Sequence, residues 1–165
     1  MTFLDPYLER LANTAFADAI RSGATLFPWL ESIHVLAITF VVGTIAIVDL
    51  RLLGFRAHRK SARRLIVELL PYTWAAFVVA VIAGALLFSS NAMGYAHNAQ
   101  FQLKLALIVL AGVNMAVFHS TAYRRIAEWD ETHPPPLRAR VAGATSLCLW
   151  IGVIFLGRWV GFTLS

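Results

Sequence analysis

Long apolar runs that are nearly free of charge recur four times along the chain. They cover about residues 28–50, 69–89, 101–123 and 141–164. Each is close to the roughly 20 residues that cross a ~30 Å hydrocarbon core as a helix. Apolar residues would lie on all sides of a helix formed by each run, whereas apolar and polar residues alternate along the strands of a membrane β-barrel. The pattern therefore predicts an all-α fold, an integral membrane four-helix bundle.

A different pattern occupies residues 1–26. Between Pro6 and Arg21 the apolar residues recur at helical spacing, and Gly23 follows as a helix stop. We expect an amphipathic helix that lies on the outer membrane surface. Packing of this helix against the bundle or a partner subunit is the open alternative. Residues 27–165 then form the domain of four transmembrane helices.

Composition also indicates a membrane protein. Of the 165 residues, 59% are hydrophobic and 14% are charged, whereas soluble domains have about 45–50% apolar and about 25% charged residues. This balance excludes an ordinary soluble enzyme and a disordered chain. One cysteine, Cys148, rules out an intramolecular disulfide, and its position within the fourth run predicts that it is buried. The expected surroundings are a lipid bilayer.

The net charge of +5 would suggest nucleic acid in a soluble protein. Ten of the fourteen Lys and Arg residues, however, lie in two loops between the apolar runs. Because such residues gather in cytoplasmic loops, we expect a multi-pass protein of a bacterial inner membrane, with both termini and the 90–100 loop in the periplasm. No nucleic-acid partner is expected. The ten residues are Arg51, Arg56, Arg59, Lys60, Arg63, Arg64, Arg124, Arg125, Arg138 and Arg140.

Ionisable residues inside membrane spans are costly and often functional. His34 lies near the outer end of the first run and His119 near the inner end of the third. Their levels differ by ~14 Å, so one metal ion or haem iron cannot bind both. His97 lies on the same side as His34, just before the third run. A haem b with these two histidines as axial ligands is therefore predicted, with Met93 as an alternative to His97.

Haem propionates need cations or hydrogen-bond donors. Lys104 and Arg158 lie at the outer ends of the third and fourth runs, where propionates would emerge. Glu31 precedes His34 by one helical turn, so it can orient the imidazole or pair with Arg158. A di-iron site would need a second Glu-x-x-His pair, which the sequence lacks. His119 is left as a possible metal ligand for a second haem.

Each histidine also has a simpler interpretation. His34 can hydrogen-bond across helices, and His97 and His119 can be ordinary polar residues. Asp49 and Arg51 are expected to form an interfacial ion pair or helix-end anchor. Asn114 is expected to form an interhelical hydrogen bond. Gly157 and Gly161 form a GxxxG pattern, which predicts close helix packing.

Several of these segments carry a family resemblance. They are Trp29–His34, Asp49–Gly54, Asn114 with Phe118 and His119, and Gly157 with Arg158. Together they resemble a family of small bacterial four-helix membrane proteins of unknown function. The resemblance implies the fold and topology but no activity. Small membrane b-type cytochromes are more loosely similar, at the level of architecture.

Two functions follow as expectations. The first is a membrane-embedded b-type haem protein that passes electrons near the periplasmic face, to or from a quinone or a periplasmic redox protein. The second is a non-catalytic accessory or scaffold subunit of a larger membrane complex. A homo-oligomer is compatible with both. Solute or ion translocation is disfavoured because the second and fourth runs lack mid-membrane charges.

Overall fold

Four long helices dominate the computed structural model, which describes residues 3, 5–55, 61–130 and 133–164. They are α3 (Leu26–Leu52), α4 (Ala62–Ser90), α6 (Ala99–Ser120) and α8 (Leu137–Thr163). All four are long and apolar enough to cross a membrane, and the described residues contain no strand. The prediction of an all-α bundle of four membrane-spanning helices is confirmed.

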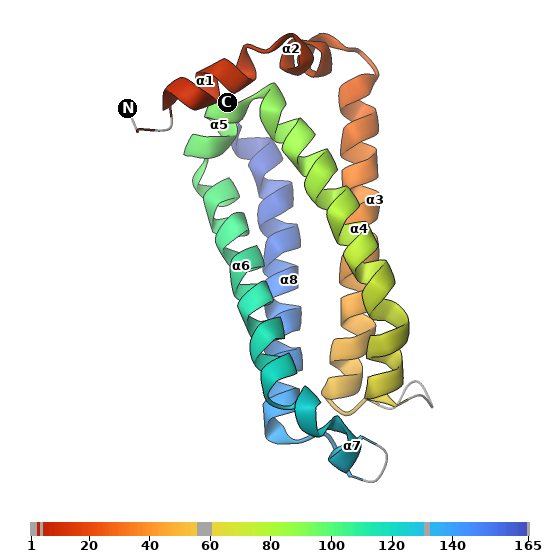
Figure 1. The fold of residues 1–165 in the computed structure, drawn as a ribbon. Coiled ribbons are helices and arrows are strands. Elements are labelled where there is room, and N and C mark those ends of the chain that lie inside the picture. Colours follow the sequence, from red (N-terminus) through yellow and green to blue (C-terminus); the bar gives the residue numbers. More distant parts are fainter. Residues whose placement is uncertain (1–2, 4, 56–60, 131–132, 165) are drawn as a thin grey trace.

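The long helices run alternately up and down, so the two chain ends lie at one end of the bundle (Figure 1). Helix α3 packs along α4, α6 packs along α8, and α3 also contacts α8. The backbones of α4 and α6, in contrast, scarcely approach each other, although Phe88 of α4 stacks on Phe101 of α6 near the end of the bundle where the two chain ends lie. Figure 1 shows α4 leaning away from α6 toward the end that carries α7 (Ile126–Trp129). The bundle is therefore closed on three sides and loosely closed between α4 and α6.

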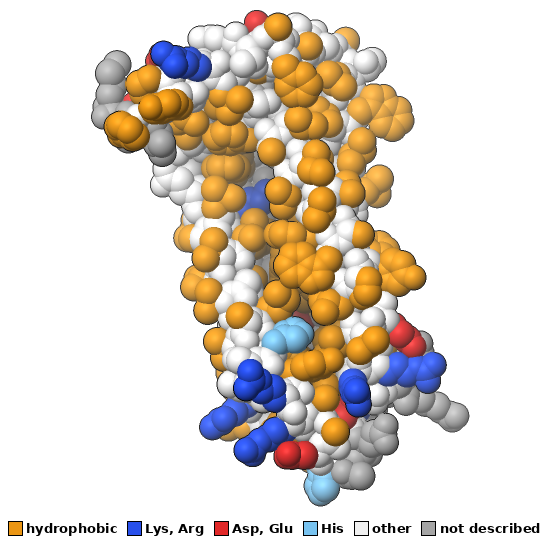
Figure 2. All heavy atoms as spheres, viewed as in Figure 1, with side chains coloured by type: hydrophobic (Ala, Val, Ile, Leu, Met, Phe, Trp, Pro, Cys, Tyr) orange, Lys and Arg blue, Asp and Glu red, His pale blue; other side chains and the backbone are white. Residues whose placement is uncertain are grey.

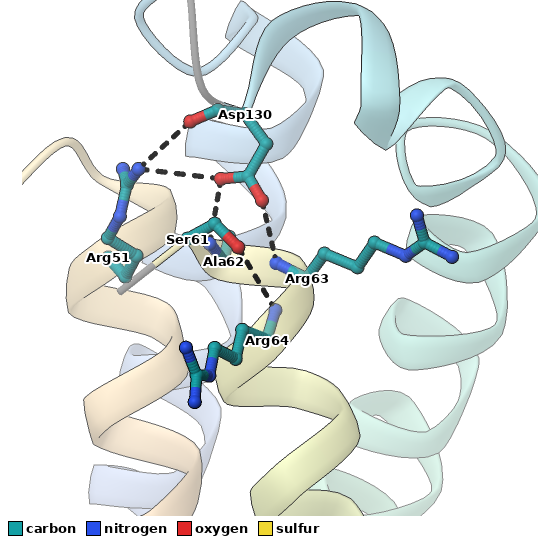
Figure 3. Close-up of polar contacts among 6 residues, drawn as sticks. All are labelled: Arg51, Ser61, Ala62, Arg63, Arg64 and Asp130. Carbon is teal, nitrogen blue, oxygen red and sulfur yellow. Dashed lines mark hydrogen bonds and ion pairs between the residues drawn. The ribbon is translucent and has the colours of Figure 1, made fainter. Parts of the chain in front are cut away.

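Helix α4 starts seven residues before the apolar run that predicted it, because polar groups cap its first turn. The Ser61 hydroxyl accepts from the Arg64 amide at 3.3 Å. One carboxylate oxygen of Asp130 accepts from the Ala62 amide at 2.7 Å and the other accepts from the Arg63 amide at 2.8 Å (Figure 3). Capping satisfies amides that have no partner within the helix, so the helix extends beyond the apolar run.

Arg51 also binds Asp130, which corrects its expected pairing with Asp49. Its guanidinium lies 3.4 Å from the Asp130 carboxylate and donates to the Asp130 carbonyl at 3.2 Å (Figure 3). Residues two apart on a helix do not face each other, so Asp49 and Arg51 point to different neighbours. Asp130 thereby joins the end of α3 to the start of α4.

The N-terminal segment forms two short helices, where the sequence predicted one. Helices α1 (Asp5–Ala12) and α2 (Ala15–Ser22) are separated at Thr14, whose hydroxyl accepts from the Ala17 amide and caps α2. Both lie across the end of the bundle (Figure 1). Helix α1 contacts α5 (Ala92–His97), and α2 contacts α3 and α4. Ala17 and Ile20 are fully buried, so α2 packs against the bundle, as the alternative interpretation held.

Hydrophobic side chains cover the outside of the long helices, as expected for a surface in lipid (Figure 2). Lys and Arg side chains gather at the end that carries α7 (Figure 2). Arg56, Arg59 and Lys60 of the first basic loop lie outside the described residues. Cys148 is exposed on α8, which corrects its expected burial: its position on the helix faces outward from the bundle.

Candidate functional site

His34 lies on α3 and packs against α4 at Ala80 and Gly84. Its Nδ1 is 2.8 Å from the carbonyl oxygen of Ala80 and donates a hydrogen bond to it. The ring rests on Gly84, where an added β-carbon would lie only 2.9 Å from the imidazole Cε1. The absent side chain of Gly84 therefore makes room for the ring. The hydrogen bond at Nδ1 fixes the tautomer and leaves the lone pair on Nε2.

Lys104 is an ionisable residue in the same half of the bundle as His34. It lies on α6, and its side chain passes over Gly157 of α8, with Nζ 3.4 Å from where a β-carbon would be. The amine is close enough to His34 for their charges to interact. Gly157 thus accommodates a lysine side chain, whereas nothing lies within 4 Å of a β-carbon on Gly161. The predicted GxxxG contact is formed at its first glycine only.

His97 belongs to a different cluster at the end of the bundle. Its Nδ1 lies 3.0 Å from the Met93 carbonyl oxygen, and its Nε2 lies 3.4 Å from the Asp5 carboxylate of α1. Both ring nitrogens therefore face oxygen atoms. Among the described residues, His97 forms no hydrogen bond or ion pair with His34. The described contacts of His97 are thus with α5 and α1, and its pairing with His34 on a haem stays a prediction.

Glu31 and Arg158 also have partners other than those expected. The Arg158 guanidinium lies over the Phe162 ring, 5.0 Å from its centroid, in a cation–π contact. Glu31 is exposed and lies near Tyr95 of α5. Burial raises the pKa of the Tyr95 hydroxyl, and the negative charge of Glu31 raises it further. Glu31 therefore acts on Tyr95 rather than on Arg158.

His119 lies near the α7 end of the bundle, one residue before the end of α6. Its Nδ1 donates to the Met115 carbonyl at 2.9 Å within the same helix. The ring packs against Tyr123 and Phe118, with centroids 5.0 Å and 5.4 Å away. No cluster of three or more His, Cys, Asp or Glu residues in the described part of the chain is arranged to hold a metal ion.

A cavity of about 160 Å³ lies beside His119, between all four long helices. Its walls are mostly hydrophobic, and Asp49 is the acidic residue that lines it. Asp49 is 5% exposed. It is hydrogen-bonded to Ser146 of α8, but its Oδ2 has no partner among the described residues. Sequence reasoning noticed Asp49 but assigned it to the membrane interface, because its distance along the helix placed it near the last turn.

Asn114 forms the interhelical hydrogen bond that its mid-span position predicted. Its Nδ2 donates to the Ala142 carbonyl of α8 at 3.0 Å. Nearby, the hydroxyls of Thr73 and Thr44 hydrogen-bond at 2.8 Å between α4 and α3. These bonds pair Asn114, Thr73 and Thr44, whereas Oδ2 of Asp49 has no partner among the described residues.

A protein-family model matches residues 10–163. The chain belongs to DUF6644, a family of unknown function. The DUF6644 match includes every membrane-spanning helix, and with them His34, Lys104 and the lining of the cavity. No curated protein and no solved structure matches the chain. Membership of DUF6644 agrees with the expected family of unknown function, while the looser similarity to b-type cytochromes remains a prediction.

Proposed function

We propose that this protein is a membrane-embedded b-type haem protein that passes electrons near the periplasmic face of a bacterial inner membrane. The observation that carries the proposal is the orientation of His34. Histidines that bind metals almost always donate their second ring N–H to a carbonyl or carboxylate, which orients the ring. The Ala80 carbonyl has this role for Nδ1, so Nε2 is the nitrogen that would bind iron.

Lys104 supports the same assignment. Its amine is within electrostatic range of His34, and a propionate needs a cation or donor near the ring. When bound, haem supplies one-electron transfer through its iron. The chain itself supplies an imidazole held in one tautomer, a cation in the same half of the bundle, and apolar helices that exclude water.

His97 does not fit the second axial position in this arrangement. Its Nδ1 donates to the Met93 carbonyl and its Nε2 faces the Asp5 carboxylate of α1, so Nε2 would have to leave Asp5 before it could bind iron. We therefore assign the iron to His34 as the protein ligand. His97 instead ties α5 to α1. His119 lies at the other end of the bundle and takes no part in this site.

The basic residues support the orientation in the membrane. Lys and Arg side chains gather at the α7 end (Figure 2), which under the positive-inside rule faces the cytoplasm. His34, α5 and both chain ends then face the periplasm. A quinone in the bilayer or a periplasmic redox protein would exchange electrons with a haem at this level.

The experiment is an optical spectrum of the protein purified from haem-replete cells. We expect b-type bands in the reduced-minus-oxidised spectrum, their loss in His34→Ala, and partial recovery when free imidazole is added to that variant. The matched controls His97→Ala and His119→Ala are expected to keep their haem. A colourless wild-type protein would contradict the proposal and favour the accessory-subunit function. A His34→Ala variant with full haem content would refute the ligand assignment.

A further inference from the structure

The cavity between the four helices has the size of a single aromatic ring. Its volume is about 160 Å³, and an apolar cavity of ~150 Å³ in another protein stays dry and binds benzene. Aromatic side chains form much of the wall, among them Trp74 and Phe77 of α4 and Trp150 of α8. Flat, apolar surroundings of this size favour a ring over a branched or highly polar ligand.

One polar group inside the cavity lacks a partner. The Oδ2 atom of Asp49 is buried and receives no hydrogen bond from the described residues. The other polar side chains nearby are paired, since Asn114 donates to Ala142 and Thr73 donates to Thr44. A buried polar atom without a partner costs free energy. A ligand that donates a hydroxyl hydrogen to Oδ2 of Asp49 would remove this cost.

The bilayer provides the route into the cavity. Both α4 and α6 contribute lining residues, yet the backbones of the two helices scarcely approach each other. Figure 2 shows hydrophobic side chains on both sides of the groove between them. A lipid-soluble molecule can therefore reach the cavity from the hydrocarbon core and leave an apolar tail between α4 and α6.

We propose that this cavity binds the head group of a quinol. The ring would lie against Trp74 and Trp150, one hydroxyl would donate to the Asp49 carboxylate, and the isoprenoid-type tail would lie between α4 and α6 in the lipid. A plain acyl chain would fill the space but leave Oδ2 without a partner. This proposal does not rest on the haem assignment, because neither His34 nor Lys104 lines the cavity.

The test uses purified protein in detergent and a decyl-substituted benzoquinol, kept reduced, as the probe. A ligand that binds the folded state raises the melting temperature (Tm) with its concentration. Wild-type protein is expected to show a saturable rise in Tm with this probe. 1-Decanol, which has a similar tail and a hydroxyl but no ring, is expected to give none. No saturable rise with the quinol, or an equal rise with decanol, would overturn the proposal.

Two glycines provide a matched pair of variants. Gly112 lines the cavity, whereas Gly43 is exposed on α3 and does not line it. A β-carbon at either position meets no atom within 4 Å, so both chains are expected to fold with leucine there. Gly112→Leu is expected to abolish the rise in Tm because its side chain occupies the cavity, and Gly43→Leu is expected to keep it. Equal binding by both variants would place the probe elsewhere and refute the site.

Asp49→Leu tests the hydrogen bond from the ring hydroxyl. Loss of a hydrogen bond to a charged or strongly polar group weakens binding by about tenfold or more. We expect the probe concentration at half-maximal rise to increase by at least that factor, and unchanged binding would refute the role of Asp49. The haem bands, if present, are expected to persist in Gly112→Leu and Asp49→Leu. Failure of one proposal can therefore be distinguished from failure of the other.

Discussion

Two buried aspartates at the same end of the bundle are expected to respond to the same substitution in opposite ways. Asp49 and Asp130 are 5% and 6% exposed. Asp49 has a hydrogen bond with Ser146, and its Oδ2 has no partner among the described residues. Asp130 accepts from two amides at the start of α4 and pairs with Arg51. Leucine at each position removes the carboxylate and keeps a side chain of comparable length.

For Asp49→Leu, the gain exceeds the loss. Removing an unsatisfied buried oxygen relieves about 1–3 kcal/mol, while the lost bond to Ser146 costs about 0.5–1.5 kcal/mol. The middle of the two ranges gives a net stabilisation of about 1 kcal/mol in the free energy of unfolding, within limits of about −0.5 and +2.5 kcal/mol. In a chain of this length, about 1 kcal/mol shifts Tm by about 2–4 °C. Tm is therefore expected to rise by about 2–4 °C.

For Asp130→Leu, the loss dominates. Breaking one side of a buried ion pair costs about 3–5 kcal/mol, and the lost helix cap adds about 1 kcal/mol. Tm is expected to fall by at least about 8 °C, as measured by thermal unfolding of the two variants in one detergent without added quinol. If Asp49→Leu lowered Tm as strongly as Asp130→Leu, the Asp49 carboxylate would have a stabilising partner and the reasoning would be wrong.

Three further predictions test close contacts and orientation. Gly84→Ala places a methyl group 2.9 Å from the His34 ring. It is expected to lower the free energy of unfolding by ~1–3 kcal/mol, and with it Tm and the haem content, whereas Gly43→Ala is expected to do neither. Gly143→Val puts side-chain atoms against the α3 backbone and Leu52, where a β-carbon already lies 3.0 Å and 3.2 Å from its neighbours. Its thermal unfolding is expected to show a comparable loss, and unchanged Tm would contradict the close approach of α3 and α8. Alkaline phosphatase fused to the C-terminus is expected to be active because it folds in the periplasm, and fusion after α7 is expected to be inactive; the reverse pattern would invert the proposed topology.

The membrane-spanning helices could be predicted from the sequence because their signal is local. Each span is a continuous apolar run, and length alone then decides the helix. The start of α4 could not be predicted this way, because its cap comes from Asp130, 68 residues further along the chain. The break at Thr14 was not predicted for another reason. The Thr14 hydroxyl caps α2 and so favours a new helix start over a continuous helix. The spacing of apolar residues is the same in both cases and does not distinguish them.

The candidate site was only partly predictable for similar reasons. His34 attracts attention as an ionisable residue in an apolar run, but its partners Ala80 and Gly84 carry no polar side chain. A backbone carbonyl and a missing side chain leave no signal in a single sequence. The contact between His97 and Asp5 depends on how α1 docks on α5. The sequence therefore indicates which polar side chains need hydrogen-bond partners, but the packing of the helices decides which partners they have.

The open side between α4 and α6 distinguishes the two functions that the sequence left open. An accessory subunit would bury this side against another protein, because apolar helix faces in lipid gain from close packing with other helices. A quinol site requires the same side to stay open to the bilayer. Val78 is exposed and lies one helical turn from Trp74 of the cavity wall. Native membranes that hold Val78→Cys in a Cys148→Ser background are expected to give no stoichiometric partner with a bifunctional thiol crosslinker, because a quinol site keeps this side open to lipid. A single crosslinked protein of another sequence would support the accessory subunit, and the cavity would then be closed by that partner.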